Sequence, residues 1–378
     1  MNALGAFRDG GLARRMAAAV TAEIDPGRGY RLMEFCGGHT HTLARYGLEQ
    51  LLPNNIEMIH GPGCPVCVLP SGRIAAAIAL AQRSGLVLCS YGDLLRVPGP
   101  GGATLMKARA AGAGVRMIYS PRDALAIARR YPARQVVFFA IGFETTAPAT
   151  AAAVVEARRL GLKNFSVFCN HVLTPPAMSG ILAVPAGVAI DGFIGPGHVA
   201  SVIGSGAFER FALVDGYPVV ITGFEPLDML QAVRQLVRQI NAGRAELENE
   251  YRRVVCRDGN ARARALMAEV FAVRAEFEWR GLGRLPFSAL RLRDEFAEFD
   301  AEARFGVHLT EVPDHKACEC AAVLRGAIRP SQCRVFGTAC TPDTPLGSCM
   351  VSSEGACAAH YRYARSGPLT VSAGAGVE

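Results

Sequence analysis

The sequence predicts an α/β protein with two similar parallel-sheet domains and a separate loop-rich part near its C-terminal end. Between residue 56 and about residue 240, short apolar runs alternate with segments whose apolar spacing is helical. The apolar runs are continuous, which is typical of strands in a parallel sheet covered on both faces. In contrast, the stretch from Cys318 to Cys357 holds six of the twelve cysteines and shows little periodic pattern.

Seven apolar runs are predicted to be buried strands because they are short, rich in β-branched or aromatic residues, and bounded by turn residues. In chain order they are residues 56–60, 86–91, 115–120, 135–142, 165–170, 192–195 and 218–223. Helices are predicted between them, for example over 72–84, 123–131 and 149–161, and also over much of 226–275. Ser71 and Ser120 are predicted N-caps, and Pro121 suits a first helical turn.

The number of strands suggests two α/β domains, one over residues 56–130 and one over 131–240. A faint internal repeat supports the split, because matching triplets follow predicted strands in both halves. The triplets are Gly142-Phe143-Glu144 with Gly223-Phe224-Glu225, and Gly61-Pro62-Gly63 with Gly195-Pro196-Gly197. Open α/β sheets bind their ligands at the carboxyl ends of strands, so these triplets mark candidate ligand sites.

Composition and charge exclude several classes of function. The chain has 378 residues, 50% of them apolar, and a net charge of +7. Its basic residues are mostly arginines that look scattered and are not interleaved with aromatics, so we expect a solvated surface and no nucleic-acid partner. No G-x-G-x-x-G or G-x-x-x-x-G-K-[ST] motif is present, so nothing indicates a dinucleotide or ATP site.

The sequence also predicts a cytoplasmic protein without a membrane span. Charged residues from Arg8 to Arg15 interrupt the apolar stretch that a signal peptide would need. The longest weakly charged stretch, 192–208, contains Pro196, His198 and several glycines, and so is predicted to be loop and strand.

The C-terminal cysteines predict a metal centre. Cys318, Cys333, Cys340 and Cys357 are separated by 14, 6 and 16 residues within turn-forming sequence, which cannot build a large core of its own. Structural disulfides are rare in the cytoplasm, and the region lacks the C-x-x-C knuckles typical of zinc sites. Wide spacing from loops favours a four-thiolate iron–sulfur cluster. Zinc and unliganded thiols remain alternatives, and spacing does not say which four of the six cysteines are ligands.

A second candidate site is the motif Glu34-Phe35-Cys36-Gly37-Gly38-His39-Thr40-His41. A thiolate beside two imidazoles is typical of a soft metal site or an activated nucleophile, and paired glycines let the backbone approach a ligand closely. The alternative is a buried cysteine with capping histidines at the start of a helix.

A third candidate is Gly61-Pro62-Gly63-Cys64-Pro65-Val66-Cys67, whose C-x-x-C spacing closes a small disulfide ring and often marks a redox pair. Half a zinc knuckle, or two reduced cysteines that only pack, are the alternatives. The remaining lone residues carry weaker signals. Cys89 and Cys169 lie inside apolar strands and are expected to pack in the core, whereas Cys256 gives no pattern. His171 and His198 follow strands and could reach the same cleft as the cysteine motifs.

Six motifs, taken in order, resemble the HypD family of hydrogenase maturation factors over nearly the whole chain. They are EFCGGHTH, GPGCPVC, IGFETTAP, CNHVLTPPAM, GFIGPGHVA and the run from Cys318 to Tyr363. The resemblance implies two similar α/β domains and a third domain, carrying a [4Fe-4S] cluster, built from both chain ends (1–55 and 241–378).

The resemblance also implies a role for each cysteine motif. The cluster ligands would be Cys318, Cys333, Cys340 and Cys357, which leaves Cys320 and Cys349 as non-ligands. Cys36 would hold the iron under assembly, with His39 and His41 close by, and Cys64 and Cys67 would form a redox-active pair.

The function implied is that of a redox-active assembly scaffold more than of a conventional turnover enzyme. The Fe(CN)2CO unit of [NiFe]-hydrogenase would be assembled on this chain with a small HypC-type chaperone and a HypE-type cyanide donor, and would reach the hydrogenase large subunit indirectly. A thiolate suits a low-spin, soft iron that carries cyanide and carbon monoxide. The competing hypotheses are a stand-alone thiol–disulfide oxidoreductase with an iron–sulfur cluster, and an iron–sulfur hydratase. Four cluster cysteines argue against the hydratase, which would leave one iron without a protein ligand.

Overall fold

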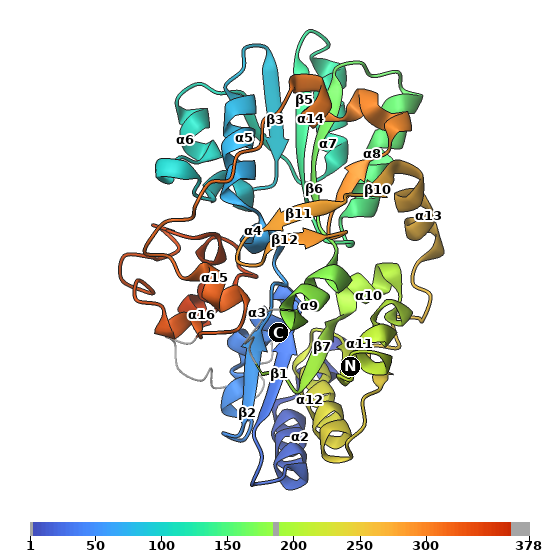
Figure 1. Ribbon diagram of the computed structural model, residues 1–378, viewed down its shortest axis with the longest axis vertical. Coiled ribbons are helices and arrows are strands. Elements are labelled where there is room, and N and C mark those ends of the chain that lie inside the picture. The colour runs from blue at the N-terminus through green and yellow to red at the C-terminus, as the bar shows by residue number, and fades with distance from the viewer. Residues whose placement is uncertain (1–2, 184–188, 364–378) are drawn as a thin grey trace, which may run out of the picture.

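The computed structural model describes residues 3–183 and 189–363. It confirms the α/β class and shows two lobes stacked along the long axis (Figure 1), each built around a parallel sheet. In the described chain, sheet A has five strands and sheet B has four. The order in sheet A is β2 (Ile56–His60), β1 (Tyr30–Glu34), β7 (Gly192–Pro196), β8 (Val219–Thr222), β9 (Leu247–Asn249). The order in sheet B is β4 (Val115–Met117), β3 (Leu86–Ser90), β5 (Gln135–Gly142), β6 (Phe165–His171).

Helices cover both faces of each sheet, as continuous apolar strands require. Alternate residues of β5 show this: Val136, Phe138 and Ala140 join one apolar cluster and Val137 and Phe139 another. The helices on sheet A include α2 (Gly10–Glu23), α3 (Gly37–Tyr46), α10 (Gly197–Ile203), α11 (Glu209–Leu213) and α12 (Pro226–Asn241). Those on sheet B include α5 (Ser71–Ala81), α6 (Leu105–Ala110), α7 (Pro121–Arg130) and α8 (Ala147–Arg159).

Smaller elements join and cover the lobes. There are two antiparallel pairs in the described chain. β10 (Phe271–Val273) pairs with β13 (Leu290–Leu292), which packs against β6, and β11 (Glu276–Trp279) pairs with β12 (Gly283–Pro286), which lies between the lobes in Figure 1. The remaining α-helices are α1 (Ala3–Ala6), α4 (Pro65–Val68), α9 (Thr174–Leu182), α13 (Ala261–Val270), α14 (Ala301–Phe305), α15 (Cys320–Leu324) and α16 (Ala356–Tyr363). No helix in the described ranges is both long and apolar enough to cross a membrane.

Strand pairing corrects the predicted division of the chain. β2 pairs with β1, and β1 with β7, so the strand at 56–60 belongs with those after residue 190, while all of sheet B is inserted between them. The sheets therefore do not follow the boundaries 56–130 and 131–240, and β1 places part of the N-terminal 55 residues in sheet A. Strands and helices alternate in the same way before and after the chain passes from one sheet to the other. The alternation therefore does not show where the chain changes lobes.

Local predictions were largely accurate. Ser120 caps α7 with Pro121 in the first turn, and Asp123 completes a capping box. Ser71 is the first residue of α5 and not its N-cap; its hydroxyl donates to Asp314. The predicted helical stretch 226–275 is broken after α12 by β9 and a loop, before α13 begins.

Candidate functional site

The carboxyl edges of the two sheets meet around a cavity of about 470 Å³. Its wall includes residues that directly follow strands of both sheets, so the fold itself brings distant motifs together. Those from sheet A are Cys36, Gly63 and His198, and those from sheet B are Tyr91, Ile118 and Phe143. Glu354 of the cysteine-rich segment also lines the cavity.

Cys36 lies at the N-cap of α3 and is 8% exposed. The loop that follows β2 packs directly on Cys36. The Gly37 amide donates to the Gly63 carbonyl at 3.1 Å, and a Cβ on Gly63 would lie 2.4 Å from the Cys36 nitrogen. Only glycine permits this approach, so the first glycines of GPGCPVC fix that loop against the Cys36 motif.

The surroundings of Cys36 favour its neutral thiol. Burial raises the pKa of Cys36 well above its ordinary value, and the nearby carboxylates of Glu354 and Glu34 raise it further. A metal cation that binds the sulfur must therefore displace a proton. This arrangement differs from that of a nucleophilic cysteine, which is activated by a lowered pKa.

Glu34 holds the Cys36 loop in place through hydrogen bonds, and this role was not predicted from the sequence. It is fully buried, and one carboxylate oxygen accepts the Cys36 backbone N–H at 2.8 Å. The other accepts the Thr40 hydroxyl and lies 2.9 Å from His60 Nδ1. Burial alone would lower the pKa of His60, but the hydrogen bond and charge of Glu34 outweigh burial and raise it. The signal that could have found Glu34 is a carboxylate at the last position of a strand, two residues before Cys36.

The two histidines of the motif do not line the cavity. His39 is fully buried, its ring stacks on Phe224 at 4.8 Å between centroids, and burial lowers its pKa to about 4. His41 lies next to the C-terminal segment, with Nδ1 3.4 Å from the Ser353 carbonyl. The cavity instead receives His198, which stacks on the other side of Phe224 at 3.7 Å. His198 is therefore the imidazole that lines this cavity, and the predicted roles of His39 and His41 beside the iron stay predictions.

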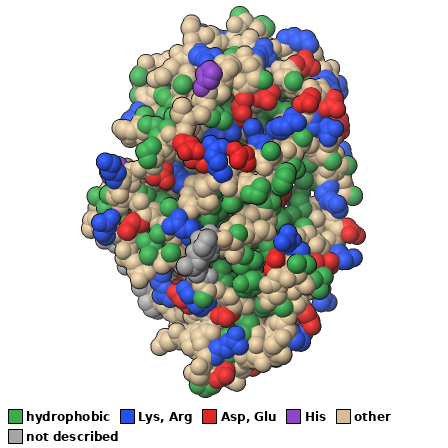
Figure 2. Space-filling model, in the orientation of Figure 1, with side chains coloured by type: hydrophobic (Ala, Val, Ile, Leu, Met, Phe, Trp, Pro, Cys, Tyr) green, Lys and Arg blue, Asp and Glu red, His purple; other side chains and the backbone are tan. Residues whose placement is uncertain are grey.

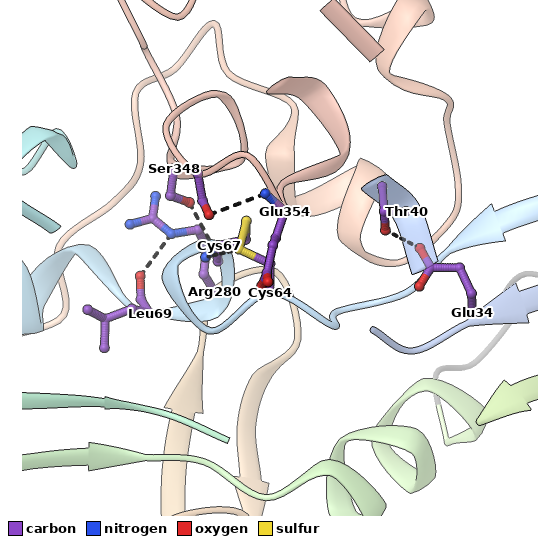
Figure 3. Close-up of a disulfide and its surroundings, with 9 residues drawn as sticks. Glu34, Thr40, Cys64, Cys67, Leu69, Arg280, Ser348 and Glu354 are labelled. Atoms are coloured by element: carbon purple, nitrogen blue, oxygen red, sulfur yellow. Dashed lines mark hydrogen bonds between the residues drawn. A yellow bond between two sulfur atoms is a disulfide. The ribbon is translucent and has the colours of Figure 1, made fainter. Parts of the chain in front are cut away.

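Cys64 and Cys67 form a disulfide around α4, with their Cα atoms 5.2 Å apart (Figure 3). Both are buried, at 4% and 0% exposure. The Cys67 carbonyl accepts the Ser348 hydroxyl at 3.0 Å, and Arg280 donates to the Leu69 carbonyl at 2.9 Å. The Ser348 bond thus ties the pair to the cysteine-rich segment.

The C-terminal cysteines lie together. The thiols of Cys320, Cys349 and Cys357 lie close enough to shift one another's pKa, and the neighbouring thiol of Cys320 lowers the pKa of Cys318 to about 7. Burial raises the pKa of Cys340, and the charges of the nearby Cys318 and Cys333 raise it further.

Soft thiol donors gathered from loops suit an iron–sulfur cluster. Within the described residues, no set of three His, Cys, Asp or Glu side chains is arranged to hold a metal ion as it stands. The arrangement does not separate four ligands from two non-ligands.

The burial of the lone cysteines confirms the predicted core positions of Cys89 and Cys169. Cys89 and Cys169 are buried in the core of sheet B, and Cys256 is exposed. His171 is also a core residue, with Nε2 2.8 Å from the Thr150 hydroxyl.

Two parallel sheets with facing carboxyl edges, a cavity that holds one buried thiol, and an adjacent C-x-x-C disulfide define an α/β thiol protein with a second, cysteine-rich segment. Comparison with known proteins gives the family. The model for the HypD family, described as "Hydrogenase formation hypA family", matches residues 11–364. The chain belongs to this family, as the motifs predicted.

Relatives from several bacteria are similar over nearly their whole length. The chain is 61% identical over 363 residues to the hydrogenase maturation factor HypD of Azotobacter vinelandii, covering 95% of this chain and 96% of that protein. It is 59% identical over 364 residues to HypD of Cupriavidus necator, covering 95% and 96%. It is 48% identical over 336 residues to HypD of Escherichia coli, covering 89% and 90%. Hydrogenase maturation is therefore the process in which this chain acts.

Proposed function

We propose that this chain is the scaffold on which the Fe(CN)2CO unit of [NiFe]-hydrogenase is assembled, and that Cys36 holds the iron. The observation that supports this proposal is the cavity itself. Its wall presents one thiol, an imidazole from His198, and two carboxylates, Asp93 and Glu354, between two lobes. A single thiolate leaves most of the iron's coordination sphere for cyanide, carbon monoxide and a partner's ligand.

The partners in this proposal are a small HypC-type chaperone that shares the iron and a HypE-type protein that delivers cyanide, with the hydrogenase large subunit served indirectly. The wall of the cavity comes from both lobes, so a partner that enters it would contact residues of both. That the protein is cytoplasmic and has no nucleic-acid partner stays a prediction.

We further propose that Cys318, Cys333, Cys340 and Cys357 hold a [4Fe-4S] cluster, which when bound supplies electrons one at a time. The Cys64–Cys67 disulfide takes up two electrons and two protons to give two thiols. The Ser348–Cys67 hydrogen bond places the cysteine-rich segment directly against this pair. Alkylation followed by mass spectrometry is expected to find the linked pair in oxidised protein and two free thiols after reduction.

The stand-alone oxidoreductase is the weaker candidate because of burial. Cys64 and Cys67 are 4% and 0% exposed, so a protein disulfide cannot reach either sulfur without opening the structure. That hypothesis also gives no role to the cavity around Cys36.

Infrared spectroscopy of the purified protein tests the scaffold proposal. We expect bands from iron-bound cyanide and carbon monoxide in the wild-type protein and their loss in Cys36→Ser, with the visible absorbance of the cluster retained. Cys256→Ser, which changes an exposed cysteine away from the cavity, is the matched control and should keep both signals. Normal maturation of hydrogenase by Cys36→Ser would refute the proposal.

A further inference from the structure

One edge of sheet B carries an unusual surface that the assembly site does not explain. Residues 105–134 hold seven basic residues and a single acidic one, on a chain whose total net charge is +7. The acidic residue, Asp123, is already used, because its carboxylate accepts the Ser120 and Tyr119 backbone amides at 3.0 Å. Seven of the 40 basic residues of the chain therefore lie in this one stretch, with almost no acidic residue beside them.

The positive charge on this edge lines a second cavity, of about 640 Å³, between β4 and α7. Its wall contains four arginines and no acidic residue: Arg109, Arg116, Arg130 and Arg134. Across the described part of the chain, none of the four has an ion pair, and none of their guanidinium groups has a hydrogen bond. Unpaired guanidinium groups in a concave surface attract carboxylates, which they bind bidentately.

Exposed apolar side chains share this edge. Four large hydrophobic residues project into solvent here: Met106 (50% exposed), Met117 (46%), Tyr119 (85%) and Tyr131 (44%). Tyrosine, methionine and arginine are the residue types enriched at protein–protein interfaces. The combination differs from a purely solvated basic face, which would carry charge without apolar groups.

The backbone adds a third feature. β4 is the end strand of sheet B and pairs only with β3 among the strands described, so its outer edge has no strand beside it. An exposed strand edge accepts an extended segment from another chain through backbone hydrogen bonds. Directly after β4, Ile118 and Tyr119 line the Cys36 cavity, so this edge is continuous with the assembly site.

We propose that the edge formed by β4 and its flanking helices α6 and α7 is the docking surface for an acidic partner protein, which lays an extended segment along β4 and so covers the mouth of the Cys36 cavity. This inference rests on the proposed function and assigns the docking surface of the chaperone that shares the iron. A protein is favoured over nucleic acid because the open strand edge and the two methionines have no use in phosphate binding.

Titration calorimetry with the purified HypC-type partner tests the proposal at low and high salt. We expect affinity to fall as salt rises, since the contact is electrostatic. Arg116→Glu on β4 should weaken binding at low salt on the order of tenfold. Arg262→Glu makes the same charge change on exposed α13, away from this edge, and should leave affinity unchanged within about twofold. Hydrogen exchange of the complex should show slower exchange at residues 114–119.

Equal effects of the two substitutions, or no protection at 114–119, would overturn the docking surface while leaving the scaffold function intact. Failure of the wild-type protein to bind this partner would also overturn it, whereas the infrared bands at Cys36 test the scaffold function independently. A single-stranded DNA of about 25 nucleotides that binds the wild-type protein and loses affinity with Arg116→Glu would overturn it in favour of nucleic acid.

Discussion

The contact between Gly63 and the Cys36 loop gives the sharpest test of how the site is built. A Cβ at position 63 would lie 2.4 Å from the Cys36 nitrogen and 2.6 Å from its Cα. Ordinary Cβ contacts begin near 3.4 Å, so the two loops must separate by about 1 Å in Gly63→Ala. The atoms that clash belong to the backbone and cannot rotate away. Gly63 does not have a positive φ, so alanine introduces no backbone strain of its own.

We expect Gly63→Ala to lower the free energy of unfolding by about 1–3 kcal/mol, the usual cost of overpacking. Denaturant titration measures this loss, and infrared spectroscopy should show weakened or shifted cyanide and carbon monoxide bands because Cys36 moves. Gly29→Ala is the matched control: its Cβ would meet only the Asn55 carbonyl, at 4.0 Å, and its stability should change by less than about 1 kcal/mol. Wild-type stability and wild-type bands in Gly63→Ala would refute the proposed loop contact.

Three further predictions concern charge and metal. Glu34 raises the pKa of His60, so their interaction stabilises the fold fully below about pH 6.5 and is lost as pH rises through the raised pKa. Glu34→Gln should remove this loss of stability with rising pH, as measured by denaturation at several pH values. Burial lowers the pKa of His171 to about 4, so stability should fall by about 3 kcal/mol between pH 6.5 and pH 4, and His171→Asn should flatten that slope. Alanine at any of the four predicted cluster ligands should abolish the visible absorbance of the cluster and expose the C-terminal segment to proteolysis. Alanine at Cys320 or Cys349 should preserve the absorbance and the resistance to proteolysis. Loss of absorbance in Cys320→Ala with retention in Cys318→Ala would refute the ligand assignment.

Burial patterns explain which parts of the fold the sequence could predict. The run 135–142 is β5 residue for residue, because the seven apolar or small residues that follow Gln135 have no other stable place than a doubly covered strand. β1 was not among the predicted strands, since Arg31 and Glu34 interrupt its apolar run. Strand pairing could not be predicted either, because apolar periodicity reports that a strand is buried and not which strand lies beside it.

The same limits apply to the site. Cys36 and the C-x-x-C pair were predictable because thiols followed by glycine or proline at strand ends are rare and specific. Glu34 was not, because its burial depends on donors from Thr40 and His60 that only the fold brings together. The direction of the histidine rings could not be predicted for a related reason. Residues at the start of α3 point in different directions, and the ring of His39 turns into the core beside Phe224.

The crossing of the chain between lobes explains why the two thiol motifs meet. β2 belongs to sheet A and α5 to sheet B, so the segment from Gly61 to Pro70 is the first crossing, and it must pass the carboxyl edge of β1. Close passage requires glycine at position 63, and the turn into α4 then places the Cys64–Cys67 ring one residue further along. Sheet A thus supplies the thiol and the imidazole, and the segment that leaves it supplies the disulfide. Sheet B supplies apolar wall residues such as Ile118 and Phe143, together with the carboxylate of Asp93. The thiol and the imidazole therefore lie with one sheet, while the proposed docking edge at β4 belongs to the other.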